Sequence, residues 1–178
     1  GVAAERADVR LRRVAELAPE AAIAANPRWA AHRDAVADLP EATLDDLEWA
    51  DGFAFGTPTR FGLPSAQLKQ FLDQTGPLWA RGVLADKVGT AFTSASTAHG
   101  GLEATVLAIN TVLYHWGSIV LPLGYTDASI DATGNPYGAS WVSRRGAGPD
   151  DDALASARHQ GRRLARTATA LQPLRGVA

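Results

Sequence analysis

The chain has 178 residues, a hydrophobic content of 46% and a net charge of -2, which fits one globular domain and excludes a disordered chain. The near-neutral charge gives no support for nucleic-acid binding, and the absence of cysteine excludes disulfides, thiolate metal sites and cysteine nucleophiles. No apolar run of about 18 residues and no signal-peptide pattern is present. We therefore expect a cytoplasmic protein with no membrane span.

The first 50 residues predict one strand and several short helices. Residues 8–14 alternate apolar and charged side chains, which predicts a half-buried strand near a sheet edge. Residues 16–42 are rich in alanine and interrupted by proline, so short helical pieces are expected at residues 21–25 and 29–37. Thr43 can cap the next helix, because two aspartates follow it in the positive first turn.

The stretch over residues 52–62 organises the rest of the chain. An apolar run long enough for one buried strand stops in a segment of Gly, Thr, Pro and Arg, and residues 65–74 then have helical spacing. Residues 75–82 read as a loop because of their Gly and Pro. Trp79 in this loop is either an anchor that holds the loop down or an aromatic wall for a planar ligand.

The second half repeats the same order. Residues 88–93 predict a buried parallel strand that ends in the small polar segment 94–101. A helix is expected over residues 102–116, stopped by Gly117, and a short strand over residues 118–121. The predicted buried stripe of the helix consists of Leu102, Val106, Ile109, Leu113 and Trp116.

The last third contains a long loop and a long helix. Residues 125–148 show neither the helical nor the strand period of apolar residues and are rich in turn-forming residues. A loop of this length usually has a function. Three aspartates then open a helix whose predicted inward stripe is Leu154, Ala157, Leu164, Ala168 and Leu171. The alternation of strands and helices predicts a doubly wound, parallel α/β sheet in one domain over residues 1–178.

Two strand ends, residues 57–61 and 94–101, carry hydroxyls and glycines and are expected to lie side by side. Such segments suit a planar ring with carbonyl and imide edges, or an anion, and Phe61 and Trp79 could cover the faces of a ring. The alternative is that both are ordinary polar turns. The four histidines lack a metal-ligand spacing, and no G-x-S-x-G string is present, so neither a metal site nor hydrolase chemistry is expected.

Several strings together closely resemble the WrbA family of flavodoxin-like, FMN-dependent NAD(P)H:quinone oxidoreductases. The most specific is G-T-P-T-R-F-G at residues 56–62, followed by F-L-D-Q-T-G at residues 71–76 and Leu78-Trp79. The similarity continues through G-N-P-Y-G-A at residues 134–139 and A-R-H-Q-G at residues 157–161.

The resemblance implies a set of site residues. Those expected to bind FMN are Thr57, Pro58, Thr59, Arg60, Phe61, Ser94, Ala95, Ser96, Thr97, Gly100, Gly101 and His115. His115 matches the family's flavin-site histidine, although a histidine packed in the core or facing the helix dipole is the plainer interpretation. Trp79 would wall the cavity in which nicotinamide and quinone alternately stack, so His115 and Trp79 are the expected catalytic residues.

The implied activity is a two-electron reduction of a quinone by NAD(P)H, alternating through the flavin. Hydride passes from NAD(P)H to the flavin, the oxidised nicotinamide leaves, and the quinone then takes two electrons. A homo-oligomer, expected to be a tetramer, is implied as well. The alternatives are a non-enzymatic flavodoxin-like electron carrier or redox-sensing interaction protein, and a flavin-free structural oligomer.

The sequence departs from the family at its start. The family begins with a central strand and a Ser/Thr/Gly-rich loop that wraps the FMN phosphate, whereas the match here begins only at residues 7–14, the family's second strand. The chain also contains no methionine. We therefore expect a processed, trimmed or partial chain, in which the absent strand leaves long strand edges unpaired.

Overall fold

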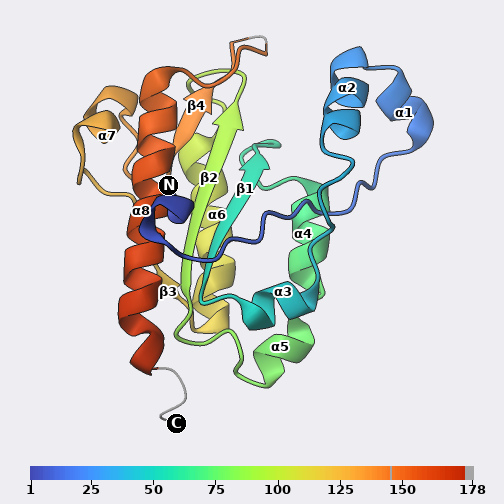
Figure 1. Cartoon of the computed structure of the whole chain (residues 1–178). Helices are drawn as coiled ribbons and strands as arrows, with labels where there is room; N and C mark the ends of the chain where they lie inside the picture. Colours follow the sequence, from blue (N-terminus) through green and yellow to red (C-terminus); the bar gives the residue numbers. More distant parts are fainter. Residues whose placement is uncertain (145, 175–178) are drawn as a thin grey trace.

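The computed structural model describes residues 1–144 and 146–174 as a parallel sheet between two layers of helices (Figure 1). The helical elements are α1 (Glu20–Ala24), α2 (Pro27–Ala35), α3 (Leu44–Trp49), α4 (Ala66–Asp73), α5 (Gly76–Ala80), α6 (Leu102–Trp116), α7 (Ala128–Thr133) and α8 (Asp151–Leu171), with the 3-10 turns η1 (Val2–Glu5) and η2 (Gln172–Leu174). The strands are β1 (Gly52–Pro58), β2 (Val88–Ala95), β3 (Ile119–Val120) and β4 (Ser140–Val142).

β2 is the centre of the sheet, and its partners all run parallel to it. β1 pairs along the length of β2, from Gly52 opposite Val88 to Pro58 opposite Ser94. The other side of β2 is shared, because β3 pairs with its first residues and β4 with its last three. The carboxyl ends of β1, β2 and β4 therefore meet at one edge of the sheet, where parallel α/β folds bind ligands.

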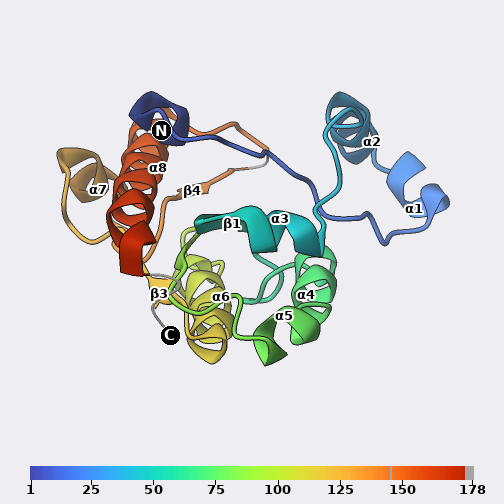
Figure 2. The same cartoon turned by 60° about the horizontal axis from the view of Figure 1, so that its bottom comes forward.

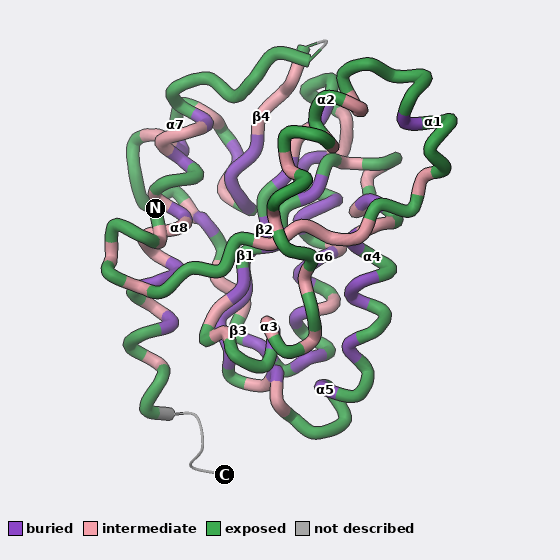
Figure 3. The backbone as a smooth tube through the Cα atoms, turned by 45° about the vertical axis from the view of Figure 1, so that its right-hand side comes forward, coloured by how far each residue is buried: buried purple, intermediate pink, exposed green. Residues whose placement is uncertain are grey.

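Helices cover both faces of the sheet, with α8 and η1 on one side and α4, α5 and α6 on the other (Figure 2). Phe53 and Phe55 lie on the same face of β1 and point toward α6. Both rings contact Trp116 edge-on, at centroid distances of 6.0 and 5.9 Å. The five apolar residues predicted as the stripe of α6 are all buried, which confirms that prediction. Figure 3 shows this buried core beside the mostly exposed α1–α2 arm.

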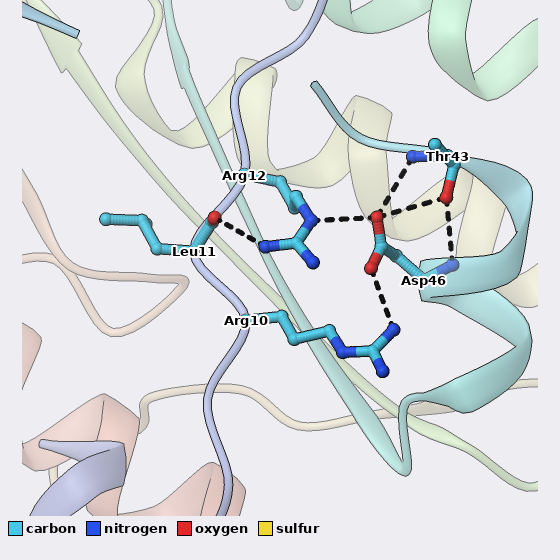
Figure 4. A network of polar contacts seen from close by, with 5 residues as sticks. All are labelled: Arg10, Leu11, Arg12, Thr43 and Asp46. Carbon is cyan, nitrogen blue, oxygen red and sulfur yellow. Dashed lines mark hydrogen bonds and ion pairs between the residues drawn. The ribbon is translucent and has the colours of Figure 1, made fainter. Parts of the chain in front are cut away.

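The N-terminal segment over residues 8–14 crosses the sheet without joining it, so the prediction of a strand there is wrong. Its arginines are held by ion pairs: Arg10 and Arg12 each donate to a different carboxylate oxygen of Asp46, at 3.0 and 2.9 Å (Figure 4). Asp46 also closes a capping box with Thr43, the predicted cap of α3. The alternating pattern thus reflects side-chain pairing with α3 rather than a backbone ladder.

The outer edge of β1 has no ladder partner among the described residues. Val88 N–H donates to the Asp51 carbonyl and Thr59 N–H to the Ser94 carbonyl, so odd-numbered residues of β1 direct their backbone groups to β2. Ala54 and Gly56 direct theirs the other way, into a cavity of about 1140 Å³ between β1, α4 and residues 8–14. The cavity agrees with the expectation of an unpaired strand edge.

Two segments predicted as loops contain regular structure. Residues 75–82 include the short helix α5, which begins with Gly76 and Pro77, where proline is tolerated. Residues 125–148 include α7, capped by Asp127, and the strand β4. The remaining predicted helices and strands are confirmed within a few residues of their expected ends.

Candidate functional site

A pocket of about 240 Å³ opens at the carboxyl ends of β1, β2 and β4, at the tips of the arrows in Figure 1. Its lining residues come from the loop after β1, from the end of β2 and the loop after it, and from the residue after β4. They are Pro58, Thr59, Arg60, Ser94, Ala95, Ser96, Thr97, Gly100 and Ser143. Eight of these nine belong to the set implied by the family resemblance, so the structure brings most of the predicted binding residues together.

Thr59 joins the two loops that frame the pocket. Its hydroxyl donates to the Gly100 carbonyl at 3.2 Å and accepts from the Thr105 hydroxyl of α6 at 2.8 Å and from Gly62 N–H at 3.2 Å. One donor and two acceptor positions of this hydroxyl are therefore in use. Thr59 thus holds the pocket's shape with its side chain, and its N–H is bonded to the Ser94 carbonyl.

The loop after β1 turns sharply at Phe61-Gly62. Arg60 and Leu63 exchange two backbone hydrogen bonds of 2.8 and 3.0 Å, and Phe61 and Gly62 have φ angles of 53° and 81°. Two consecutive left-handed residues make the mirror-image turn that usually requires Asn or Gly. Phe61 instead occupies the first position with its ring fully exposed. Strain of this kind is typical of positions kept for function.

Gly101 brings the second loop against this turn. Its φ is +93°, and a Cβ added there would lie 2.7 Å from the Gly62 Cα atom. Only glycine allows both the left-handed backbone and this close approach. The two loops therefore close over one side of the pocket because residue 101 has no side chain.

Ser143 is the lining residue that the sequence did not indicate. It follows β4, and its N–H donates to the Ala95 carbonyl at 2.7 Å, extending the ladder that pairs Ala95 with Val142. Ser143 belongs to the segment predicted as a structureless loop, and only its pairing with β2 brings it to the pocket. No local sequence signal marks that pairing.

Among the residues that line the pocket, Arg60 has the charged side chain. Its guanidinium donates to the Thr59 carbonyl at 3.2 Å, while the side chain stays exposed at the rim. Hydroxyls, backbone groups and one cation suit a polar ring edge or a negatively charged group.

Among the described residues no cluster of His, Asp and Glu could hold a metal ion, and none of the helices there has the length and hydrophobicity of a membrane span.

Five predicted residues are not among the lining residues. Phe61 and Gly101 belong to the loops that frame the pocket, whereas Thr57, Trp79 and His115 lie elsewhere. Thr57 is buried beneath the pocket, where its hydroxyl accepts from Ser65 N–H at 3.0 Å. Trp79 and His115 lie together at the opposite end of the sheet, since Trp79 Nε1 donates to the His115 carbonyl at 2.9 Å. About 20 Å of helix separates the start of α6, at the pocket, from His115.

Comparison with known proteins agrees with this geometry. The sequence profile described as "NADPH-dependent FMN reductase" matches residues 1–131. The chain belongs to this FMN reductase family. A protein named "NAD(P)H dehydrogenase (quinone)" from Deinococcus radiodurans is 45% identical over 88% of this chain and 78% of its own length. A protein of the same name from Geobacter metallireducens is 42% identical over 93% of this chain and 85% of its own length.

Comparison with a solved structure identifies the fold. The crystal structure described as a flavodoxin, WrbA-like protein from Agrobacterium tumefaciens superposes with a TM-score of 0.57 at 27% identity, covering 72% of this chain and 71% of that chain. The predicted flavodoxin-like fold and the resemblance to the WrbA family are thereby confirmed.

Proposed function

We propose that this chain reduces quinones with electrons from NAD(P)H through a bound FMN. The observation that carries the proposal is the pocket itself: eight lining residues match the WrbA pattern, and they meet where a flavodoxin-like sheet binds its ligand. The donor set fits the ring end of FMN, whose carbonyl and imide edge needs both donors and acceptors. When bound, FMN supplies the acceptor and donor of the hydride.

In this proposal the protein binds the flavin and orients the substrates against it, with residues 94–97 facing the polar edge of the ring. Arg60 offers a positive charge that favours negative charge on the reduced ring. Phe61, held outward by its turn, provides an aromatic surface next to the ring for a planar substrate.

We further propose that the chain forms a homo-oligomer, a tetramer by resemblance, in which Trp79 and His115 of one subunit approach the pocket of another. Within one chain they lie a helix length from the pocket. The outer surface of α6 carries two large apolar side chains between the two ends, because Leu107 and Tyr114 keep 44% and 63% of their surface exposed. An antiparallel pairing of two α6 helices would bring the pocket of one copy next to Trp79 of the other.

As a third part of the proposal, residues 1–178 form one flavodoxin-like domain that works in the cytoplasm.

The decisive experiment is a visible absorbance titration of the purified protein with FMN, followed by NADH and then benzoquinone without oxygen. A flavin spectrum that bleaches with NADH and returns with quinone supports the proposed reaction. A bound flavin that bleaches but does not pass electrons to quinone would favour an electron carrier. Protein that binds no flavin would overturn the proposal.

A further inference from the structure

Gln160 is a buried polar residue on the sheet-facing side of α8, with only 5% of its surface exposed. Its amide nitrogen donates to the Thr90 hydroxyl at 2.6 Å and to the Ala91 carbonyl at 2.8 Å, and its amide oxygen accepts from Ala139 N–H at 2.8 Å. One side chain of α8 thus binds β2 and the residue before β4 at the same time.

The position of these bonds explains why an amide is needed. β3 pairs with Val88 and Gly89 and β4 with Thr93 to Ala95, so the edge of β2 between them has neither strand beside it at Ala91. The Gln160 amide lies in this gap and supplies a donor to β2 and an acceptor to the chain entering β4. Glutamine has both groups on one carboxamide, which neither an apolar side chain nor a carboxylate provides.

The consequence reaches the pocket through β4. Ala139 gives its N–H to Gln160, and its carbonyl accepts from Thr93 N–H at 3.1 Å, which starts the ladder between β4 and β2. The ladder runs on to Ser143, whose N–H donates to the Ala95 carbonyl and which lines the pocket. The register of the whole strand therefore depends on where Ala139 is held.

We propose that Gln160 is a positioning residue for the flavin pocket: by fixing the start of β4 against β2 from α8, it places Ser143 and the end of β2 that form the pocket's side wall. This inference rests on the proposed function for its catalytic consequence, but the placement of β4 can be measured without any flavin. The hydrogen-bond partners of Gln160 are Thr90, Ala91 and Ala139, which do not line the pocket.

The test compares Gln160→Met, which keeps the length and removes all three bonds, with Ser156→Ala. Ser156 is fully buried on the same face of α8, one turn earlier, and its hydroxyl has no hydrogen-bond partner. Ser156→Ala therefore controls for a change in a buried polar side chain of α8. Both variants are measured for hydrogen exchange at the Ser143 amide and for FMN affinity, at a temperature where circular dichroism shows each to be folded.

For Gln160→Met we expect exchange at Ser143 to accelerate about tenfold, while amides of α4 keep wild-type rates, and the dissociation constant for FMN to rise about tenfold. Ser156→Ala should change neither. Unchanged exchange at Ser143, or equal acceleration throughout the protein, would overturn the proposal whether or not flavin binds. If wild-type protein binds no flavin, the proposed function fails, and the exchange rates alone decide the positioning role.

A second variant, Gln160→Glu, separates hydrogen bonding from packing. Its ionised carboxylate would face the Ala91 carbonyl, whereas the protonated form can donate to that carbonyl and still accept from Ala139. Burial raises the pKa of such a carboxyl, so FMN affinity relative to wild type should recover between pH 8 and pH 5.5, about fivefold. A ratio that does not change with pH would mean that the amide acts only by filling space, which contradicts the proposal.

Discussion

The two ends of the sheet carry the two groups of residues that the family resemblance joined into one site, and they are built differently. At the carboxyl end, Thr59 and Gly101 lock two loops together around a pocket. At the amino end, Trp79 and His115 meet through one hydrogen bond, and Trp79 keeps 57% of its surface exposed. One end thus holds a pocket formed within a single chain, while the other is a surface with an exposed aromatic side chain.

The largest effect is expected from Gly101→Ala at the carboxyl end. The added Cβ would lie 2.7 Å from the backbone of Gly62, so the two loops must separate, and we expect FMN affinity to fall at least 100-fold in a flavin titration. Gly82→Ala is the matched control at the other end, since Gly82 also has a positive φ but nothing within 4 Å of its added Cβ. Equal flavin affinities in the two variants would show that loop closure is not needed.

At the amino end, Trp79→Ala should lower kcat/KM for benzoquinone about tenfold and leave the FMN dissociation constant within twofold of wild type. Trp49→Ala controls for loss of an exposed tryptophan elsewhere, because Trp49 keeps 43% of its surface exposed on α3. Mixing refolded Trp79→Ala and Gly101→Ala chains should restore part of the activity, since mixed oligomers would combine an intact pocket with an intact tryptophan. Mixtures no more active than their components would argue against a shared site.

A stability effect of about 2 kcal/mol is expected from Asp46→Asn. Burial alone would raise the pKa of Asp46, but hydrogen bonds from Arg12, the Thr43 backbone and Arg10 outweigh it and lower the pKa from 3.8 to about 2. Because the folded pKa lies below the unfolded one, this stabilisation is full above about pH 4 and is lost as the pH falls through 2.

Urea unfolding of wild type and Asp46→Asn at pH 7 and pH 2.5 measures this difference, which should shrink at the lower pH. FMN affinity at pH 7 should stay unchanged, because Asp46 lies near the amino end of the sheet. A stability difference that is the same at both pH values would assign the effect to lost packing instead of charge.

The smallest effect concerns Phe61, whose left-handed backbone strains the loop. Phe61→Gly should raise the free energy of unfolding by about 0.5–1 kcal/mol, because glycine accepts a φ of 53° without a steric penalty. The same variant should lower quinone turnover, since it removes the exposed ring beside the pocket. Unfolding curves and turnover with benzoquinone measure both, and a variant that is more stable and equally active would remove Phe61 from the proposed site.

Much of the fold could be predicted because local and tertiary preferences agree. The run of β2 is buried over most of its length, β1 buries Phe53 and Phe55 on one face, and the stripe of α6 packs as its helical period indicates. The strand predicted at residues 8–14 is absent because, in the described part of the chain, only Arg13 finds a backbone partner there, at Glu41, while Arg10 and Arg12 form ion pairs with Asp46. In the first half of α8, the apolar stripe was also wrong: Ala157 is exposed, whereas Ser156 and Gln160 are buried.

The candidate site likewise contains some residues that the sequence indicates and others that it does not. The loops after β1 and β2 could be found from sequence, because glycine, threonine and serine directly follow recognisable strands. Ser143 and Gln160 could not, since each matters only through a contact with β2 made across a long stretch of chain. Whether Trp79 and His115 serve the pocket stays a prediction, because it depends on a second subunit.

The open edge of β1 has a consequence for how the protein behaves in concentrated solution. Among the described residues no strand pairs with the outward backbone groups of Ala54 and Gly56. Such groups are a template on which strands of other molecules can assemble, and charges near such an edge discourage this. The arginine-rich segment that crosses the sheet beside the cavity supplies those charges, and Asp46 keeps it in place. Acid or high salt weakens that attachment, so colloidal stability should decline under conditions in which the rest of the fold persists.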